Sequence, residues 1–148
     1  MANNNNIVSE FVRNNLRGQP DPDAIPRMSR MLHVDRSITD INIKDSTWND
    51  RTALHYQSFY GTTGSVAWLL RQDPPPYIDV RDSNQNTPLM LAVWSDEDSE
   101  GKVRLLLDHG ADRDMKDRDG RTALDMAREY NKPAVIDMLE NHRPDVSR

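Results

Sequence analysis

Histidine is the side chain of this sequence best suited to proton transfer or metal binding near neutral pH. Its four copies, His33, His55, His109 and His142, lie far apart along the chain, and nothing in their spacing brings a set of ligands together. The sequence has no cysteine, so it offers no thiolate ligand either. We therefore expect neither a metal site nor a cofactor, and we expect structural roles for His55 and His109.

The segment ADRDMKDRDG (residues 111–120) is rich in aspartate, a calcium-binding residue type. The calcium-binding loop of helix–loop–helix sites needs acidic or Asn residues at positions 1, 3 and 5, glycine at position 6 and glutamate at position 12. With Gly120 at position 6, Asp117 and Asp119 fall correctly, but Met115 and Met126 take positions 1 and 12. The calcium pattern fails, and turn formation explains these aspartates better.

Motifs for nucleophilic catalysis and for phosphate or dinucleotide binding are missing from the sequence, which contains no G-x-S-x-G, no P-loop and no G-x-G-x-x-G. Serine, histidine and aspartate are all present, but nothing in their positions pairs them. We therefore expect no catalytic residues and a protein that is not an enzyme. An enzyme would need polar groups that converge in a pocket.

Net charge and hydropathy narrow the class of partner. The net charge is −5 and no block of basic residues occurs, which argues against nucleic-acid binding. The longest apolar run, LMLAVW (89–94), is far shorter than the roughly 20 residues that cross a membrane, and the first ten residues lack the features of a secretory signal. We expect a cytoplasmic or nuclear protein, monomeric in isolation, whose partner is another protein or a peptide.

An internal repeat organises most of the chain. Thr52, Thr87 and Thr122 are spaced by 35 residues. Apolar residues recur in step with them, first as Leu54, Leu89 and Leu124 and then as the pairs Leu69-Leu70, Leu105-Leu106 and Met138-Leu139. One unit of this length cannot bury its apolar face alone, so neighbouring units must stack into a solenoid.

These repeats resemble those of the ankyrin family. The segments TPLMLA (87–92), LLLDHGAD (105–112) and DRDGRTALDMA (117–127) are similar to the family pattern D-x-x-G-x-T-P-L-H-x-A followed by L-L-L-x-x-G-A-D. The resemblance covers roughly residues 40–142, and it implies an all-α solenoid of helix–turn–helix units joined by hairpin-like loops. It also implies that His55, which stands in the histidine position of the pattern, hydrogen-bonds the backbone of a neighbouring loop.

The residue types support this geometry independently. Threonine is a good N-cap, and Pro88 is tolerated at the first position of a helix because its missing N–H would be unpaired there. Each threonine therefore predicts a first helix of eight or nine residues, and Asp125 predicts a capping box with Thr122. Second helices are predicted at roughly 64–72, 101–108 and 133–141. Gly61 and Asn131 fall between the two helices, where a left-handed residue is expected.

The repeats predict a domain organisation and some departures from the pattern. We expect a mobile leader (1–6), a degenerate N-terminal capping repeat (7–44) and a tail (144–148) around three ankyrin repeats (45–77, 78–112 and 113–143, the last serving as the C-terminal cap). The usual turn glycine occurs only as Gly120, and Asp50 and Gln85 replace it elsewhere, so those turns are expected to be strained or of another type. The loop SDEDSEG (95–101) is about two residues longer than the pattern.

The resemblance also implies where a partner would bind. Ankyrin stacks offer a concave surface made of loop tips and outward positions of the first helices. The partner-binding candidates at these positions are Trp48, Arg51, Phe59, Tyr60, Asn84, Asn86, Trp94, Arg118, Arg121 and Tyr130. Trp, Tyr and Arg are enriched at interface hot spots. We expect the aromatic members to form a row with rungs about 10 Å apart, the usual distance between neighbouring helices.

Two alternatives stay open at this surface. Large rings often pack against adjacent loops or helices, so some of these aromatics could be structural. The acidic residues Asp96, Glu97, Asp98 and Glu100 form a candidate contact loop for a basic partner, or simply a solvated loop.

The functional hypothesis is a non-catalytic protein–protein interaction module that binds its partner through the concave loop and inner-helix surface. The alternative is a regulatory inhibitor or adaptor that masks or tethers an enzyme, a transcription factor or a ubiquitin ligase.

Overall fold

The computed structural model describes residues 41, 42, 44 and 49–142. The expected leader, the tail, Trp48 and nearly all of the expected N-terminal capping repeat lie outside the described residues. Among the helices of the described part, none is both long enough and apolar enough to cross a membrane.

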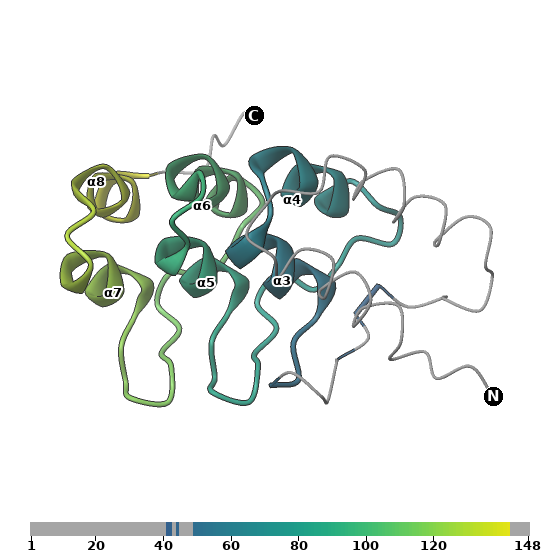
Figure 1. Ribbon diagram of the computed structural model, residues 1–148, viewed down its shortest axis with the longest axis horizontal. Coiled ribbons are helices and arrows are strands. Elements are labelled where there is room, and N and C mark those ends of the chain that lie inside the picture. The colour runs from purple at the N-terminus through teal and green to yellow at the C-terminus, as the bar shows by residue number, and fades with distance from the viewer. Residues whose placement is uncertain (1–40, 43, 45–48, 143–148) are drawn as a thin grey trace.

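The described helices come in pairs along the chain. Their bounds are α3 (Ala53–Tyr60), α4 (Thr63–Leu70), α5 (Pro88–Trp94), α6 (Ser99–Asp108), α7 (Ala123–Glu129) and α8 (Pro133–Asn141). In Figure 1, α3, α5 and α7 form one row and α4, α6 and α8 form a second row above it. The long loops between pairs project from the α3–α5–α7 row as narrow hairpin-like extensions. The expected all-α solenoid of helix–turn–helix units is confirmed.

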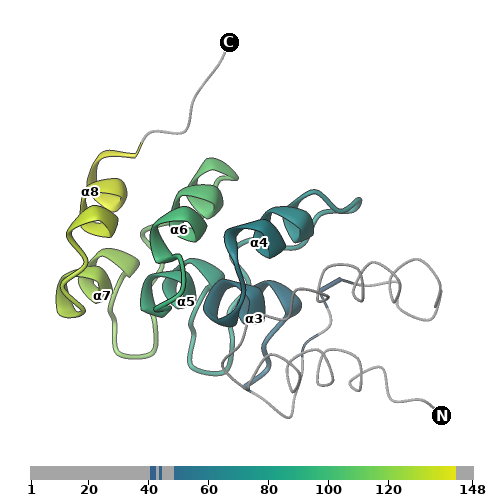
Figure 2. The same ribbon diagram turned by 45° about the horizontal axis from the view of Figure 1, so that its top comes forward.

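The core lies between the two rows and between successive pairs. The inner helices α3, α5 and α7 contact one another in order, as do the outer helices α4, α6 and α8. Figure 2 shows the same two rows after rotation. The central helix α5 lies between α3 and α7. Its residues Leu89, Met90, Leu91, Ala92 and Val93 are all buried. Burial of these side chains is the main force that joins one repeat to the next.

Threonine caps begin all three inner helices, as predicted. The hydroxyl of Thr52, Thr87 or Thr122 accepts a hydrogen bond from the backbone N–H three residues later, and Pro88 occupies the first turn of α5. Asp125 completes the predicted capping box by accepting from the Thr122 N–H at 3.0 Å. These contacts satisfy N–H groups that have no partner within the helix.

The prediction for the inter-helix turns is half right. Asn131 has a left-handed φ of 53°, as expected, but Gly61 is extended, with a φ of −90°. Gly61 is needed for close packing instead, because a Cβ atom there would lie 2.2 Å from the Gln57 side-chain oxygen and 2.7 Å from the Gln57 carbonyl oxygen. The glycine therefore lets the α3–α4 turn fold tightly against the end of α3.

Turns of one type occur at the tips of both complete long loops. In each, the N–H of the fourth turn residue donates to an aspartate carbonyl, from Gln85 to Asp82 and from Gly120 to Asp117, at 3.0 Å in both cases. Gln85 and Gly120 share the left-handed region, with φ values of 64° and 78°, and Asp50 has a φ of 53°. Asp50 and Gln85 therefore adopt the left-handed conformation that suits glycine, and their side chains add a steric cost.

Substitution of Gln85 by glycine is expected to raise the free energy of unfolding by about 0.5–1 kcal/mol, because relief of the left-handed strain outweighs the larger entropy of glycine in the unfolded chain. Urea denaturation measures this change. The reciprocal variant, Gly120→Ala, should be destabilised by a similar amount, since its φ of 78° suits glycine while the space around it is open. A Gln85→Gly variant less stable than the wild type would show that the left-handed conformation of Gln85 is not strained.

Candidate functional site

An aromatic row runs along the C-terminal ends of the three inner helices. It comprises Tyr60 and Phe59 on α3, Trp94 on α5 and Tyr130, which ends α7. Successive ring centroids are 4.6 Å (Tyr60–Phe59), 5.3 Å (Phe59–Trp94) and 6.4 Å (Trp94–Tyr130) apart. The expected rung spacing of about 10 Å is therefore wrong, because the side chains lean toward one another across the distance that separates the helix axes.

The two ends of the aromatic row differ in packing. Phe59 and Tyr60 are half-buried and meet edge to face. Trp94 and Tyr130 are nearly parallel, at 6°, and remain 43% and 37% exposed. Parallel rings with centroids 6.4 Å apart can touch only when offset, since carbon atoms in contact lie about 3.5–4.0 Å apart. The stack therefore does not remove either residue from solvent.

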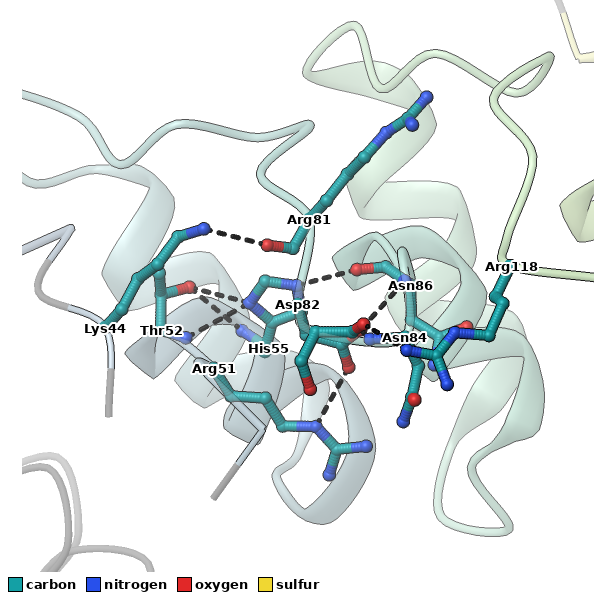
Figure 3. Close-up of polar contacts among 10 residues, drawn as sticks. Lys44, Arg51, Thr52, His55, Arg81, Asp82, Asn84, Asn86 and Arg118 are labelled. Carbon is teal, nitrogen blue, oxygen red and sulfur yellow. Dashed lines mark hydrogen bonds and ion pairs between the residues drawn. The ribbon is translucent and has the colours of Figure 1, made fainter. Parts of the chain in front are cut away.

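The loop residues form a second cluster, at the N-terminal ends of the inner helices. Asp82 is its centre (Figure 3): one carboxylate oxygen accepts from the backbone N–H groups of Asn84 and Asn86, both at 2.9 Å, and the other pairs with Arg51 at 3.1 Å. Asn86 is only 8% exposed, and Arg51 is half-buried. These candidates therefore hold the α4–α5 loop in place. Little of the Asn86 surface is accessible to a partner.

His55 fastens this loop to α3. One ring nitrogen, Nδ1, accepts from the Thr52 N–H at 3.1 Å, and Nε2 donates to the Asn86 carbonyl at 2.9 Å (Figure 3). This pattern requires a neutral ring with its proton on Nε2. Burial lowers the pKa of His55 from 6.5 to about 4, against the opposing effects of the Asn86 carbonyl and Asp82. The expected loop-backbone bond of His55 is present.

The α6–α7 loop repeats the arrangement with different partners. Asp117 accepts from the N–H groups of Asp119 and Arg121 at 2.9 Å, which is the turn-forming role predicted for this aspartate. The Arg121 guanidinium lies 3.0 Å from Asp117 and 2.9 Å from Glu129, and its hydrogen bond to Glu129 is the largest cause of its raised pKa. Glu129 precedes Tyr130, so Arg121 links the loop cluster to the aromatic row along α7.

Adjacent loops are joined edge to edge. The Arg118 N–H donates to the Asn84 carbonyl at 3.1 Å, and the Arg118 guanidinium donates to the Ser83 carbonyl at 3.2 Å. Arg118 is exposed and Asn84 is half-buried, so both present side chain to solvent at the loop tips. The loops and the aromatic row thus bound the same inner-helix surface from its two ends.

The acidic candidates follow Trp94 directly. Asp96 and Glu97 are exposed in the α5–α6 loop, Asp98 stands at the N-cap position of α6 without a side-chain capping bond, and Glu100 lies in the first turn of α6. Asp98 also accepts a hydrogen bond from the Thr63 hydroxyl of the preceding repeat. The inserted loop is therefore partly structural. Within the described part of the chain, no group of three or more His, Asp and Glu side chains is placed to hold a metal ion.

Two lysines that sequence reasoning missed hold the ends of inner helices. Lys102 is fully buried on α6, and its ammonium donates to the Gly61 carbonyl at 2.9 Å and to the Ser95 hydroxyl at 2.8 Å. Burial lowers the pKa of Lys102 to about 8. Lys132 donates to the Val93 and Ser95 carbonyls at 2.7 and 2.6 Å. The only sequence signal for the burial of Lys102 was its position immediately before Val103, which is itself buried.

Tyr77 was missed as well. It is 70% exposed beyond the three prolines of the α4–α5 loop, and its N–H donates to the Asn42 side chain at 2.7 Å. Its ring is not among those in contact in the aromatic row.

Comparison with known proteins agrees with the repeat geometry. A family model of ankyrin repeats in three copies matches residues 1–117. The match includes the segment before residue 41 and stops before α7, although α7 and α8 continue the same two rows.

Curated relatives share the repeats within larger proteins. The chain is 32% identical over 138 residues to a transient receptor potential cation channel subfamily A member 1 homolog of Caenorhabditis elegans, which is 85% of this chain. It is 31% identical over 98 residues to delta-latroinsectotoxin-Lt1a of Latrodectus tredecimguttatus (64% of the chain) and 28% identical over 104 residues to human CAP-Gly domain-containing linker protein 3 (70%). It spans 11%, 8% and 18% of these proteins.

Proteins with such different names have in common the stacked repeat rather than one activity. Ankyrin-repeat domains are generally protein–protein interaction modules and are typically non-catalytic. The 35-residue period, the threonine-capped inner helices, the histidine that bonds the next loop and the family match lead to one conclusion: this chain belongs to the ankyrin-repeat family.

Proposed function

We propose that the chain binds a protein or peptide partner through the surface between the aromatic row and the loop tips. The observation that carries the proposal is the exposed Trp94–Tyr130 pair, in which two large rings from neighbouring repeats stack yet remain 43% and 37% exposed. Exposed aromatic surface that neighbouring side chains hold in place costs little entropy to bury on binding, which suits an interface hot spot.

Arginines extend this surface toward the loops. Arg121 lies between the loop turn and Glu129, and Arg118 stands exposed on the tip of the α6–α7 loop. Their positions are fixed by hydrogen bonds at 3.2 Å or less. Arginine can stack on rings and donate several hydrogen bonds, so a partner lying along α7 would meet apolar and polar anchors in succession.

Replacement of Trp94 by alanine is expected to weaken partner binding by at least tenfold while lowering the free energy of unfolding by only about 1 kcal/mol, since the ring is substantially exposed. The partner would be captured with the wild-type chain and identified by mass spectrometry. Dissociation constants and urea unfolding curves would then be measured for both proteins.

Tyr77→Ala is the matched control, because it removes an even more exposed aromatic ring that lies outside the aromatic row. Its affinity should equal that of the wild type. Equal affinity of the wild type and the Trp94→Ala variant would remove the aromatic row from the interface, and global unfolding of the variant would assign Trp94 to the core.

A further inference from the structure

A groove continues the surface beyond the Trp94–Tyr130 pair. It encloses about 500 Å³ between the α5–α6 loop and the start of α8. Its lining begins at Ser95 and Asn131, the residues that directly follow the two rings. An extended segment resting on the exposed ring faces can therefore pass into the groove without leaving the protein surface.

The groove is acidic. Its lining includes three carboxylates, Asp96, Asp98 and Glu100, and one cation, Lys132. The Lys132 ammonium is engaged with the Val93 and Ser95 carbonyls, where it offsets the negative end of α5. Among the described residues, no basic side chain lies within ion-pair distance of these carboxylates or of the neighbouring Glu97. Lys132 and the buried Lys102 offset part of this charge from a distance, but three carboxylates against one lysine in the lining leave the groove net negative.

The adjoining ring faces favour the same sign of charge. The face of an aromatic ring is electronegative and attracts ammonium and guanidinium groups, most strongly at Trp. Trp94 and Tyr130, both partly exposed, therefore lie beside the residues that line an acidic groove.

We infer that the partner segment bound here is an extended peptide rich in arginine or lysine, with one cationic side chain on the Trp94–Tyr130 rings and others beside the carboxylates of the groove. This inference rests on the proposed function and specifies the chemistry of the partner. An acidic segment would meet a net charge of the same sign, and a purely apolar one would leave the carboxylates desolvated and without an ion pair.

Selection from a phage-displayed library of random dodecapeptides, with the full chain as bait, tests the inference. The enriched peptides should carry an excess of Arg and Lys over the unselected library. A synthetic peptide of the enriched sequence should bind at least tenfold more weakly to Trp94→Ala, and several-fold more weakly to the double variant Asp96→Asn/Glu100→Gln. Its affinity should also fall as salt rises, because exposed charges are screened.

Asp73→Asn/Asp114→Asn is the matched control, since it removes the same net charge at exposed positions outside the groove lining. Enriched peptides without a basic excess, or basic peptides that bind both double variants equally, would overturn the inference. Sensitivity of those same peptides to Trp94→Ala would leave the proposed function standing. If the wild-type bait enriches no peptide more strongly than the Trp94→Ala bait does, the inference of a linear basic segment is also overturned. The proposed function fails only if the captured protein binds the Trp94→Ala variant as tightly as it binds the wild type.

Discussion

Replacement of Lys102 by alanine is expected to lower the free energy of unfolding by about 3 kcal/mol. The side chain is fully buried, so its loss opens a cavity and removes the ammonium that donates to the Gly61 carbonyl at 2.9 Å and to the Ser95 hydroxyl at 2.8 Å. The Ser95 hydroxyl keeps the Glu97 N–H as a donor, so the Gly61 carbonyl is the acceptor left unsatisfied. Cavity formation and an unsatisfied buried acceptor each cost on the order of 1–3 kcal/mol. Urea unfolding of the wild type and the variant measures the difference.

Hydrogen exchange locates the damage. Lys102 joins α6 to the α3–α4 turn, so protection should fall most in α3 and α4 and least in α7 and α8. The Lys116→Ala variant removes an exposed lysine and should match the wild type within about 0.5 kcal/mol. Lys102→Met keeps most of the volume without the donors, so its loss should be smaller than that of alanine. A Lys102→Ala variant as stable as Lys116→Ala would refute this role.

Acidification from pH 6.5 to pH 4 is expected to cost about 3 kcal/mol of stability through His55 alone. The pKa of this ring is about 4 in the folded chain, against 6.5 when unfolded, so only the unfolded chain takes up its proton between these values. The contribution is therefore complete above pH 6.5 and is lost as the pH falls through 4, at about 1.4 kcal/mol per pKa unit. Protonation would also place a hydrogen on Nδ1, which could then no longer accept the hydrogen bond from the Thr52 N–H.

Two measurements isolate the His55 contribution. NMR titration of the histidine ring protons should give His55 a pKa well below 6.5. Urea unfolding at pH 7 and pH 4 should show a smaller pH dependence in His55→Gln than in the wild type, by about 3 kcal/mol. Titration of His55 near 6.5 would show that the ring is not held neutral by burial.

The fold follows from the sequence because its period, caps and apolar positions are local signals. Thr52, Thr87 and Thr122 mark the starts of the inner helices, and the predicted second helices agree with α4, α6 and α8 within a few residues. The conformation of Gly61 was mispredicted because a non-local constraint decides it: the close approach of Gln57, which no propensity scale encodes. Gln85 shows the converse, since the loop hydrogen bonds impose a glycine conformation on an unsuitable residue.

The sequence predicted which residues of the candidate site recur from repeat to repeat, but not which of them touch or are buried. Repeat alignment placed Phe59 and Trp94 at one position and Tyr60 and Tyr130 at the next, and the structure brings the rings of Phe59, Trp94 and Tyr130 together. Alignment could not distinguish an exposed residue from a buried one in the loops, which is why Asn86 was included as readily as Asn84. Lys102 and Lys132 escaped notice because their acceptors are backbone carbonyls about 40 residues earlier, which carry no sequence signature.

Lys102 and Lys132 give the described stack a direction. Lys102 donates backward to the end of α3 and Lys132 to the end of α5, so each of these two inner helices takes its terminal cation from the repeat that follows. Removal of α7 and α8 would take the Lys132 donor from the Val93 and Ser95 carbonyls, whereas removal of α3 and α4 would leave Lys102 its bond to the Ser95 hydroxyl. Either removal exposes one apolar face, so the difference lies in the carbonyls that lose their donor. Shortened forms of the chain should therefore tolerate loss of their first repeat better than loss of their last.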